Sequence, residues 1–83
     1  MYTKELTAIT VRKTIERQEQ SIQILYDHWK HLQIRADAEF CATNAEQFEA
    51  YQEAMDYVEA KLLRKYRRLA CLQERLADIQ LSA

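Results

Sequence analysis

Two histidines, His28 and His31, are the side chains whose type and spacing best suit metal binding. Their His-x-x-His spacing places both on one side of a helix, but a metal site needs further ligands that converge on the ion. The two cysteines, Cys41 and Cys71, would lie about 45 Å apart on a straight helix, too far for a shared site or a disulfide. We therefore expect solvent-facing or interface histidines, free thiols, and no metal or cofactor.

The other polar residues give no sign of an active site. The chain contains no glycine, so it has no glycine-rich loop to cradle a phosphate. The two histidines have Asp27 near them in the sequence but no nucleophile. We expect a protein without enzymatic activity, whose function rests on binding.

Residues 61–68, KLLRKYRR, are the strongest candidate for contact with an anionic partner. Five basic residues and Tyr66 suit phosphate contacts and base stacking. The whole chain has 12 basic and 13 acidic residues, however, so it offers no long-range attraction to nucleic acid or to an anionic membrane surface. Acidic residues fill the turns before the run. We interpret the run as a solvated or partner-pairing face, and we regard nucleic acid as unlikely on this charge balance.

The composition predicts an all-α protein, because glycine and proline are absent and helix-forming residues dominate the 83 positions. A break is expected within CATNAEQF, where Thr43 or Asn44 caps a new helix. We predict helices over residues 4–40 and 45–81 in a single domain, 1–83. The first turns are rich in β-branched side chains, so they either fray or form a separate short helix.

Apolar residues recur every three or four positions in both halves, which is the spacing of a coiled-coil seam. A short polar connection between two such helices predicts an antiparallel hairpin. In this arrangement Trp29 faces Met55 and Val58, and Gln18 and Lys65 fall near the same layer. They either form a polar layer in the seam, or Lys65 extends its charged end to water. The predicted seam residues are Ile15, Ile22, Leu25, Trp29, Leu32, Phe48, Tyr51, Met55, Val58, Leu62, Leu69 and Leu72.

Several apolar residues fall outside the seam, which indicates a second buried face. A small hairpin cannot enclose its own core, since each helix has one neighbour, so we expect a protein partner, and a homo-oligomer when the chain is alone. The alternative is that the first turns fold back over these residues. The predicted partner-binding residues are Tyr57, Leu63, Tyr66, Ala70, Ile24 and Ile34.

The N-terminus, MYTKELTAITVRK, has no apolar core of the kind found in secretory signals. No stretch approaches the ~20 apolar residues of a membrane span. We therefore expect a soluble, cytoplasmic protein.

Residues 45–62 resemble the second helix of the small needle-protein co-chaperones of bacterial type III secretion systems. The similar residues are Gln47, Phe48, Gln52, Ala54, Glu59 and Leu62. The resemblance implies a helical hairpin that binds a second, tetratricopeptide-like secretion chaperone and helps to keep the needle subunit monomeric in the bacterial cytoplasm before export. Two other classes fit the same pattern: a homodimeric four-helix bundle that binds RNA or DNA, and a generic helical adaptor.

Overall fold

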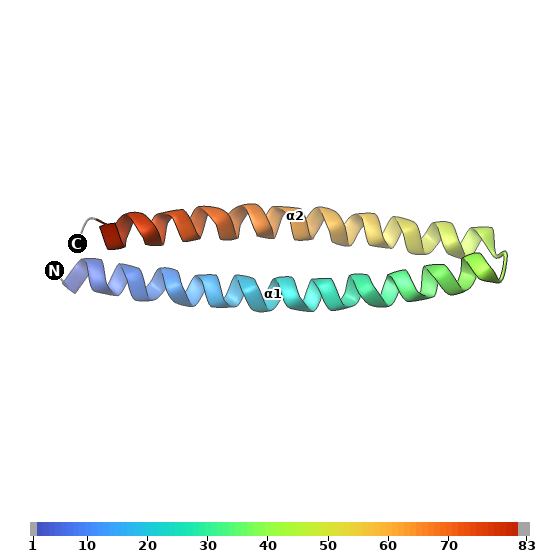
Figure 1. Ribbon diagram of the computed structural model, residues 1–83, viewed down its shortest axis with the longest axis horizontal. Coiled ribbons are helices and arrows are strands. Elements are labelled where there is room, and N and C mark those ends of the chain that lie inside the picture. Colours follow the sequence, from blue (N-terminus) through green and yellow to red (C-terminus); the bar gives the residue numbers. More distant parts are fainter. Residues whose placement is uncertain (1, 82–83) are drawn as a thin grey trace.

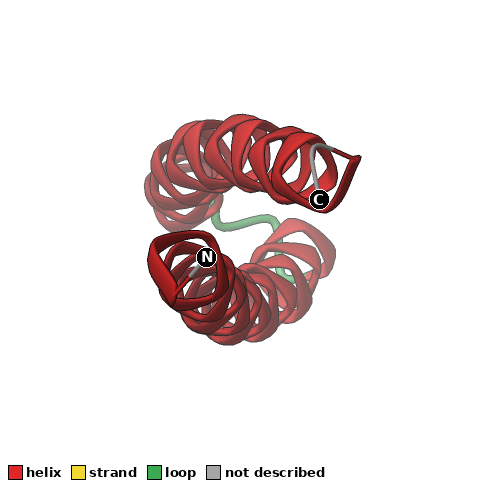
Figure 2. Cartoon of the chain, turned by 90° about the vertical axis from the view of Figure 1, so that its left-hand side faces the viewer, coloured by secondary structure: helices red, strands yellow, loops and turns green. Residues whose placement is uncertain are grey.

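The computed structural model describes residues 2–81, which form two antiparallel helices joined by a tight turn (Figure 1). Helix α1 covers Tyr2–Cys41 and helix α2 covers Ala45–Leu81. The helices wind around each other (Figure 2), and the Cα atoms span 62 × 15 × 13 Å. The predicted all-α hairpin is confirmed. Helix α2 has the predicted bounds, whereas α1 is slightly longer than predicted.

Helix α1 is continuous through its β-branched first turns, so no separate short helix forms and these turns do not fold back. Two threonine hydroxyls bond within the helix. Thr10 Oγ1 donates to the carbonyl of Leu6, and Thr14 Oγ1 donates to the carbonyl of Thr10, each at 2.9 Å. A hydroxyl bonded to the carbonyl four residues earlier satisfies its own polar atoms without leaving the helix.

The turn begins with a Schellman motif, in which two backbone bonds close the end of α1. The N–H of Thr43 donates to the carbonyl of Phe40 at 3.1 Å, and the N–H of Asn44 donates to the carbonyl of Glu39 at 3.0 Å. Thr43 has a φ of 58°, the conformation that glycine usually supplies at this position. A side chain with a Cβ costs roughly 1–2 kcal/mol there, so the turn is stable in spite of Thr43.

Asn44 then begins α2 as its N-cap. Its Oδ1 accepts the backbone N–H of Gln47 at 3.4 Å, and its carbonyl accepts the N–H of Phe48 at 3.0 Å. These bonds satisfy donors that the first turn of a helix leaves without partners. Of the two capping candidates, Asn44 takes this role, and Thr43 lies in the turn just after α1.

Trp29 fixes the register between the helices. Its indole N–H donates to Oε1 of Glu59 at 2.9 Å, next to the position expected for Val58. Six of the predicted seam residues are buried, namely Ile15, Ile22, Leu32, Met55, Val58 and Leu62. The other six, Leu25, Trp29, Phe48, Tyr51, Leu69 and Leu72, are half-buried.

A polar residue divides this seam. Gln18 is half-buried, and its Oε1 is buried without a hydrogen-bond partner among the described residues. The main core cluster begins at Ile22, whereas Val11 and Ile15 are buried on the other side of Gln18. Lys65 is also half-buried. An unsatisfied buried carbonyl costs roughly 1–3 kcal/mol, so Gln18 weakens the open end of the hairpin.

Candidate protein-binding surface

The side chains best suited to metal binding do not come together among the described residues. His28, His31, Cys41 and Cys71 are all exposed, and both cysteines are free thiols. Within residues 2–81, no three His, Cys, Asp or Glu side chains converge as metal ligands would. Over the same residues, neither helix combines the length and the apolar character needed to cross a membrane. The features that remain are the exposed apolar and charged side chains.

The helical register sorts these side chains onto two flanks. In a heptad whose a and d residues form the seam, positions b and e lie on one side and positions c and g on the other. Because the helices are antiparallel, each flank combines the same positions from both helices. The contacts follow this geometry. Trp29 reaches Glu59, an e residue, whereas the g residues Thr14, Arg68 and Arg75 line a common hollow.

The two flanks have opposite charge. The b and e side, here the acidic flank, has the acidic residues Glu5, Glu16, Glu19, Asp37, Glu49, Asp56 and Glu59 and the basic residues Arg12 and Lys30. The c and g side, here the basic flank, has Arg17, Arg35, Lys61, Arg64, Arg68 and Arg75, with Asp78 as its acidic residue among residues 5–81. The net charge of the chain is only −1 because the strong negative charge of one flank offsets the strong positive charge of the other.

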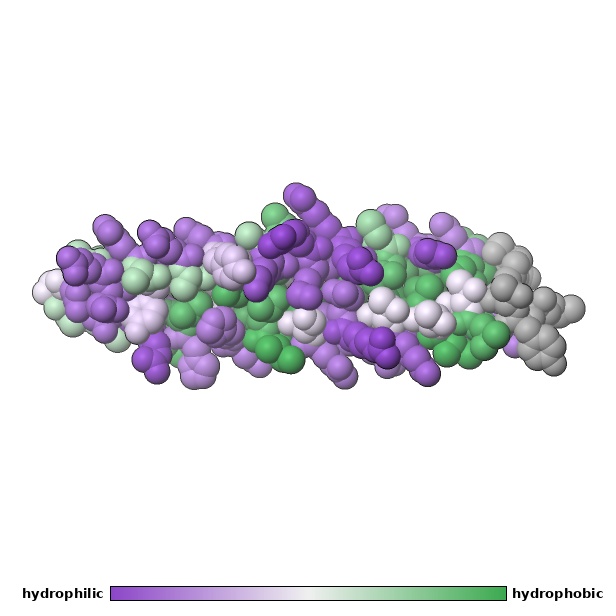
Figure 3. All heavy atoms as spheres, turned by 180° about the vertical axis from the view of Figure 1, so that it is seen from behind, coloured by the Kyte–Doolittle hydropathy of each residue, from purple (hydrophilic) through white to green (hydrophobic). Residues whose placement is uncertain are grey.

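Three predicted partner-binding residues lie together on the acidic flank. Leu63, Tyr66 and Ala70 follow one another at spacings of three and four, so they form one stripe along α2. Leu63 is 53% exposed and Tyr66 is 51% exposed. On the face of the hairpin shown in Figure 3, apolar side chains reach the surface between hydrophilic ones. We call this stripe, together with Tyr26 of α1, the aromatic patch.

Tyr26 joins the patch from α1, although it was absent from the predicted set. It lies one turn before Trp29, so it is level with the turn of α2 that follows Glu59. Its ring stacks on Trp29, with centroids 6.2 Å apart and an interplanar angle of 13°, and Lys30 Nζ lies 4.9 Å from its centroid. These contacts restrict the orientation of the Tyr26 ring. Its e position in the heptad was the signal that could have identified it.

Phe40 and Phe48 make a second apolar site on the acidic flank, beside the turn. Their ring centroids are 5.5 Å apart with an interplanar angle of 53°. Phe48 is half-buried in the seam, whereas Phe40 is 68% exposed. A shallow hollow of about 430 Å³ lies against the two rings and is also lined by Thr43 and Asn44. Phe40 was likewise missed, because it stands in the last turn of α1, where the seam pattern ends.

The other three predicted partner-binding residues lie elsewhere on the hairpin. Tyr57 and Ile24 are at c positions on the basic flank, and Ile34 is at an f position on the outer surface of α1. Tyr66 is nine positions after Tyr57, which is about two and a half turns, so their side chains leave α2 in opposite directions. The six predicted residues therefore do not form one surface.

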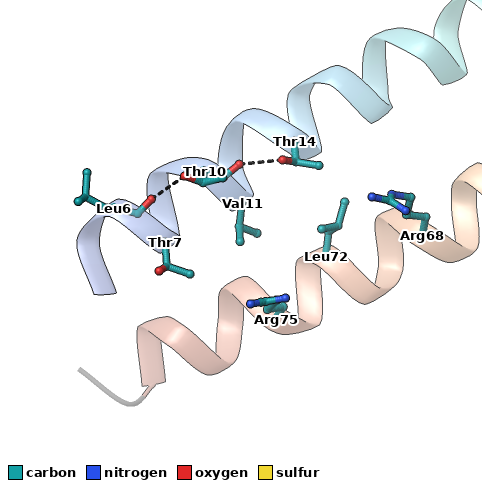
Figure 4. Close-up of a pocket in the computed structure, with 8 residues that line it drawn as sticks. All are labelled: Leu6, Thr7, Thr10, Val11, Thr14, Arg68, Leu72 and Arg75. Atoms are coloured by element: carbon teal, nitrogen blue, oxygen red, sulfur yellow. Dashed lines mark hydrogen bonds between the residues drawn. The ribbon is translucent and has the colours of Figure 1, made fainter. Parts of the chain in front are cut away.

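The basic flank is hollowed near the open end of the hairpin. The hollow of about 470 Å³ is lined by Thr10 and Thr14 of α1 and by Arg68 and Arg75 of α2 (Figure 4). The short threonine side chains leave space between the helices, and the two guanidinium groups make it cationic. No protein-family model, curated protein or solved structure matches this chain, so its function has to be argued from these surfaces.

Proposed function

We propose that this hairpin is a binding protein without catalytic activity, which docks the aromatic patch of its acidic flank onto a helical partner protein. The observation that carries the proposal is the exposure of Leu63 and Tyr66 on one stripe beside the preordered ring of Tyr26. Large side chains of this kind supply binding hot spots when a partner buries them. Burying each one contributes roughly 1.5–3 kcal/mol.

The charges around the patch indicate the chemistry of the partner. Glu19 and Asp56 lie on the same flank as Leu63 and Tyr66, and all four are exposed. A complementary surface would be an apolar groove bordered by lysine or arginine, because like charges at its rim would be repelled. The concave side of a helical-repeat protein offers such a groove to an amphipathic helix.

The specific partner that we propose is a second, tetratricopeptide-like chaperone of a type III secretion system. In the resulting cytoplasmic complex, the two chaperones would keep the needle subunit monomeric before export. Two features support this proposal: the resemblance of residues 45–62 to the needle-protein co-chaperones, and a hairpin that presents apolar surface without a reactive site.

Without its partner, we propose that the hairpin associates with itself. Each helix has one neighbour, and the acidic flank leaves Ile9, Tyr26, Phe40, Leu63 and Tyr66 exposed. Apolar side chains gathered on one side of a small protein commonly mark an interaction surface. Sedimentation that shows a cooperatively folded monomer at micromolar concentration would argue against self-association.

Co-expression tests the proposed function. The wild-type hairpin is expected to co-purify with the needle subunit and the second chaperone of the same secretion system. Leu63→Asp is expected to reduce the amount of complex that is recovered, while the helical circular dichroism signal stays unchanged. Failure of the wild-type chain to enter the complex would refute the secretion role.

A further inference from the structure

We propose that the basic flank is a docking surface for the acidic flank of a second copy of this chain. The proposal rests on the self-association inferred above and specifies which surfaces meet. Both complementary surfaces are present on the same chain, so every copy supplies a binding site and its ligand at equal concentration. The six basic residues of one flank and the seven acidic residues of the other make this pairing electrostatically favourable.

The two flanks also match along the length of the hairpin. The bond between Trp29 and Glu59 sets which residues of α1 and α2 are level. With this register, Arg68 is level with the turn of α1 that holds Glu19, and Arg64 is level with the turn that holds Tyr26. Two copies lying side by side in the same direction bring α2 next to the neighbour's α2, so Arg64 and Arg68 are level with its Tyr66, and Tyr26 and Glu19 lie at the same levels on its α1.

Arginine and tyrosine suit each other in such a contact. A guanidinium group over an aromatic ring contributes roughly 0.5–2 kcal/mol, depending on how far the pair is desolvated. The chain already makes two cation–π contacts with lysine, since Lys30 Nζ lies 4.9 Å from the centroid of Tyr26 and Lys61 Nζ lies 4.5 Å from that of Tyr57. Arg64 and Arg68 are exposed and can extend over the rings of a neighbour.

A second copy fits the basic flank better than a nucleic acid does. The Cα atoms of the hairpin span about 15 Å across its width, nearly twice the Debye length of about 8 Å at physiological ionic strength, so the two flanks act on a partner largely independently. The basic flank also leaves the apolar side chains of Ile24 and Tyr57 exposed. The acidic flank of a second hairpin offers apolar groups that can cover them as well as opposite charge, whereas a phosphate backbone offers charge alone.

The pairing has a distinctive consequence for assembly. Different surfaces meet in each contact, so the interface is heterologous, and each end of a dimer still has one unpaired flank. Such assemblies grow into rings or open arrays, whereas a symmetric four-helix bundle stops at the dimer. The average mass of the free protein should therefore keep rising with concentration and should fall at high salt.

Charge reversal tests the proposal. One variant, Arg64→Glu with Arg68→Glu, removes most of the positive charge of the basic flank, and another, Glu19→Lys with Asp56→Lys, removes most of the negative charge of the acidic flank. Each variant alone is expected to self-associate about tenfold more weakly than the wild type in sedimentation, and an equimolar mixture of the two is expected to recover association. Recovery in the mixture also shows that both variants are folded.

Matched controls place the same charge changes at f positions, away from both flanks: Lys13→Glu with Arg67→Glu, and Glu53→Lys with Glu74→Lys. Both controls should behave like the wild type. Three results would each overturn the proposal. The first is a monomeric wild type, and the second is a symmetric dimer whose association neither flank variant weakens. The third is a wild type that binds a 20-base-pair duplex through Arg64 and Arg68 in place of a second copy. None of these outcomes alters binding to the second chaperone, which co-purification measures separately.

Discussion

The indole N–H of Trp29 in α1 donates a hydrogen bond to Oε1 of Glu59 in α2 at 2.9 Å. It is a side-chain link between residues far apart in the sequence, and it crosses the seam at the edge of the acidic flank. Trp29 also stacks on Tyr26. The same residue therefore fixes the helix register and orients one ring of the aromatic patch.

Replacing Trp29 with Phe should lower the free energy of unfolding by about 1 kcal/mol beyond the loss of packing, because the hydrogen bond to Glu59 disappears. The bond can be isolated by a double-mutant cycle with Glu59→Ala, followed by urea denaturation and circular dichroism. A coupling free energy near zero would mean that Glu59 does not hold Trp29 in solution.

Thr43→Gly should stabilise the hairpin by roughly 1 kcal/mol. Thr43 has a φ of 58°, and glycine adopts this conformation without a clash of Cβ. The matched control is Ala42→Gly, one residue earlier, which should destabilise because it only adds flexibility to the unfolded chain. Denaturation midpoints of the two variants should therefore move in opposite directions, and a fall for both would contradict the left-handed turn.

Gln18→Leu should stabilise the hairpin by roughly 1–2 kcal/mol, since it removes a buried oxygen that has no hydrogen-bond partner among the described residues. It also joins the two parts of the apolar core. Gln20→Leu, on the exposed side of α1, serves as the control and should have little effect. Equal gains from both substitutions in thermal unfolding would show that general hydrophobicity, and not the buried oxygen, is responsible.

Phe48→Ala and Phe40→Ala should differ in their effect on the stability of the hairpin, although both residues lie near the turn. Phe48 is half-buried against the core, so its loss should cost about 2 kcal/mol, less than for a fully buried phenylalanine. Phe40 is 68% exposed, and its truncation should change the unfolding free energy little. A larger effect from Phe40 in chemical denaturation would show that it belongs to the core.

The seam could be predicted from the sequence because burial repeats with the period of the helix. The three-four spacing identified residues such as Ile22, Met55 and Leu62, and the polar turn gave the hairpin. The conformation of Thr43 could not be predicted, since a left-handed residue is normally marked by glycine and the chain has none. The continuity of α1 through its β-branched first turns could not be predicted either, because helix propensity does not take packing against a second helix into account.

The binding surface was only partly predictable. Being outside the seam identifies a residue as exposed, but it does not say on which flank the residue lies. Tyr57 and Tyr66 were grouped together for this reason, although half a turn of α2 separates their directions. Tyr26 was overlooked because it borders the seam. The flank of each residue follows only when the heptad positions of both antiparallel helices are combined.

The central claim is that the acidic flank, and not the basic flank, binds the partner chaperone. Isothermal titration of the second secretion chaperone with Leu63→Asp, Tyr66→Ala and Tyr57→Ala tests it directly. Leu63→Asp and Tyr66→Ala should each weaken binding by roughly 1–3 kcal/mol, while Tyr57→Ala, on the opposite side of α2, should leave the Kd unchanged. The account would be contradicted if Tyr57→Ala raised the Kd while Leu63→Asp and Tyr66→Ala left it unchanged.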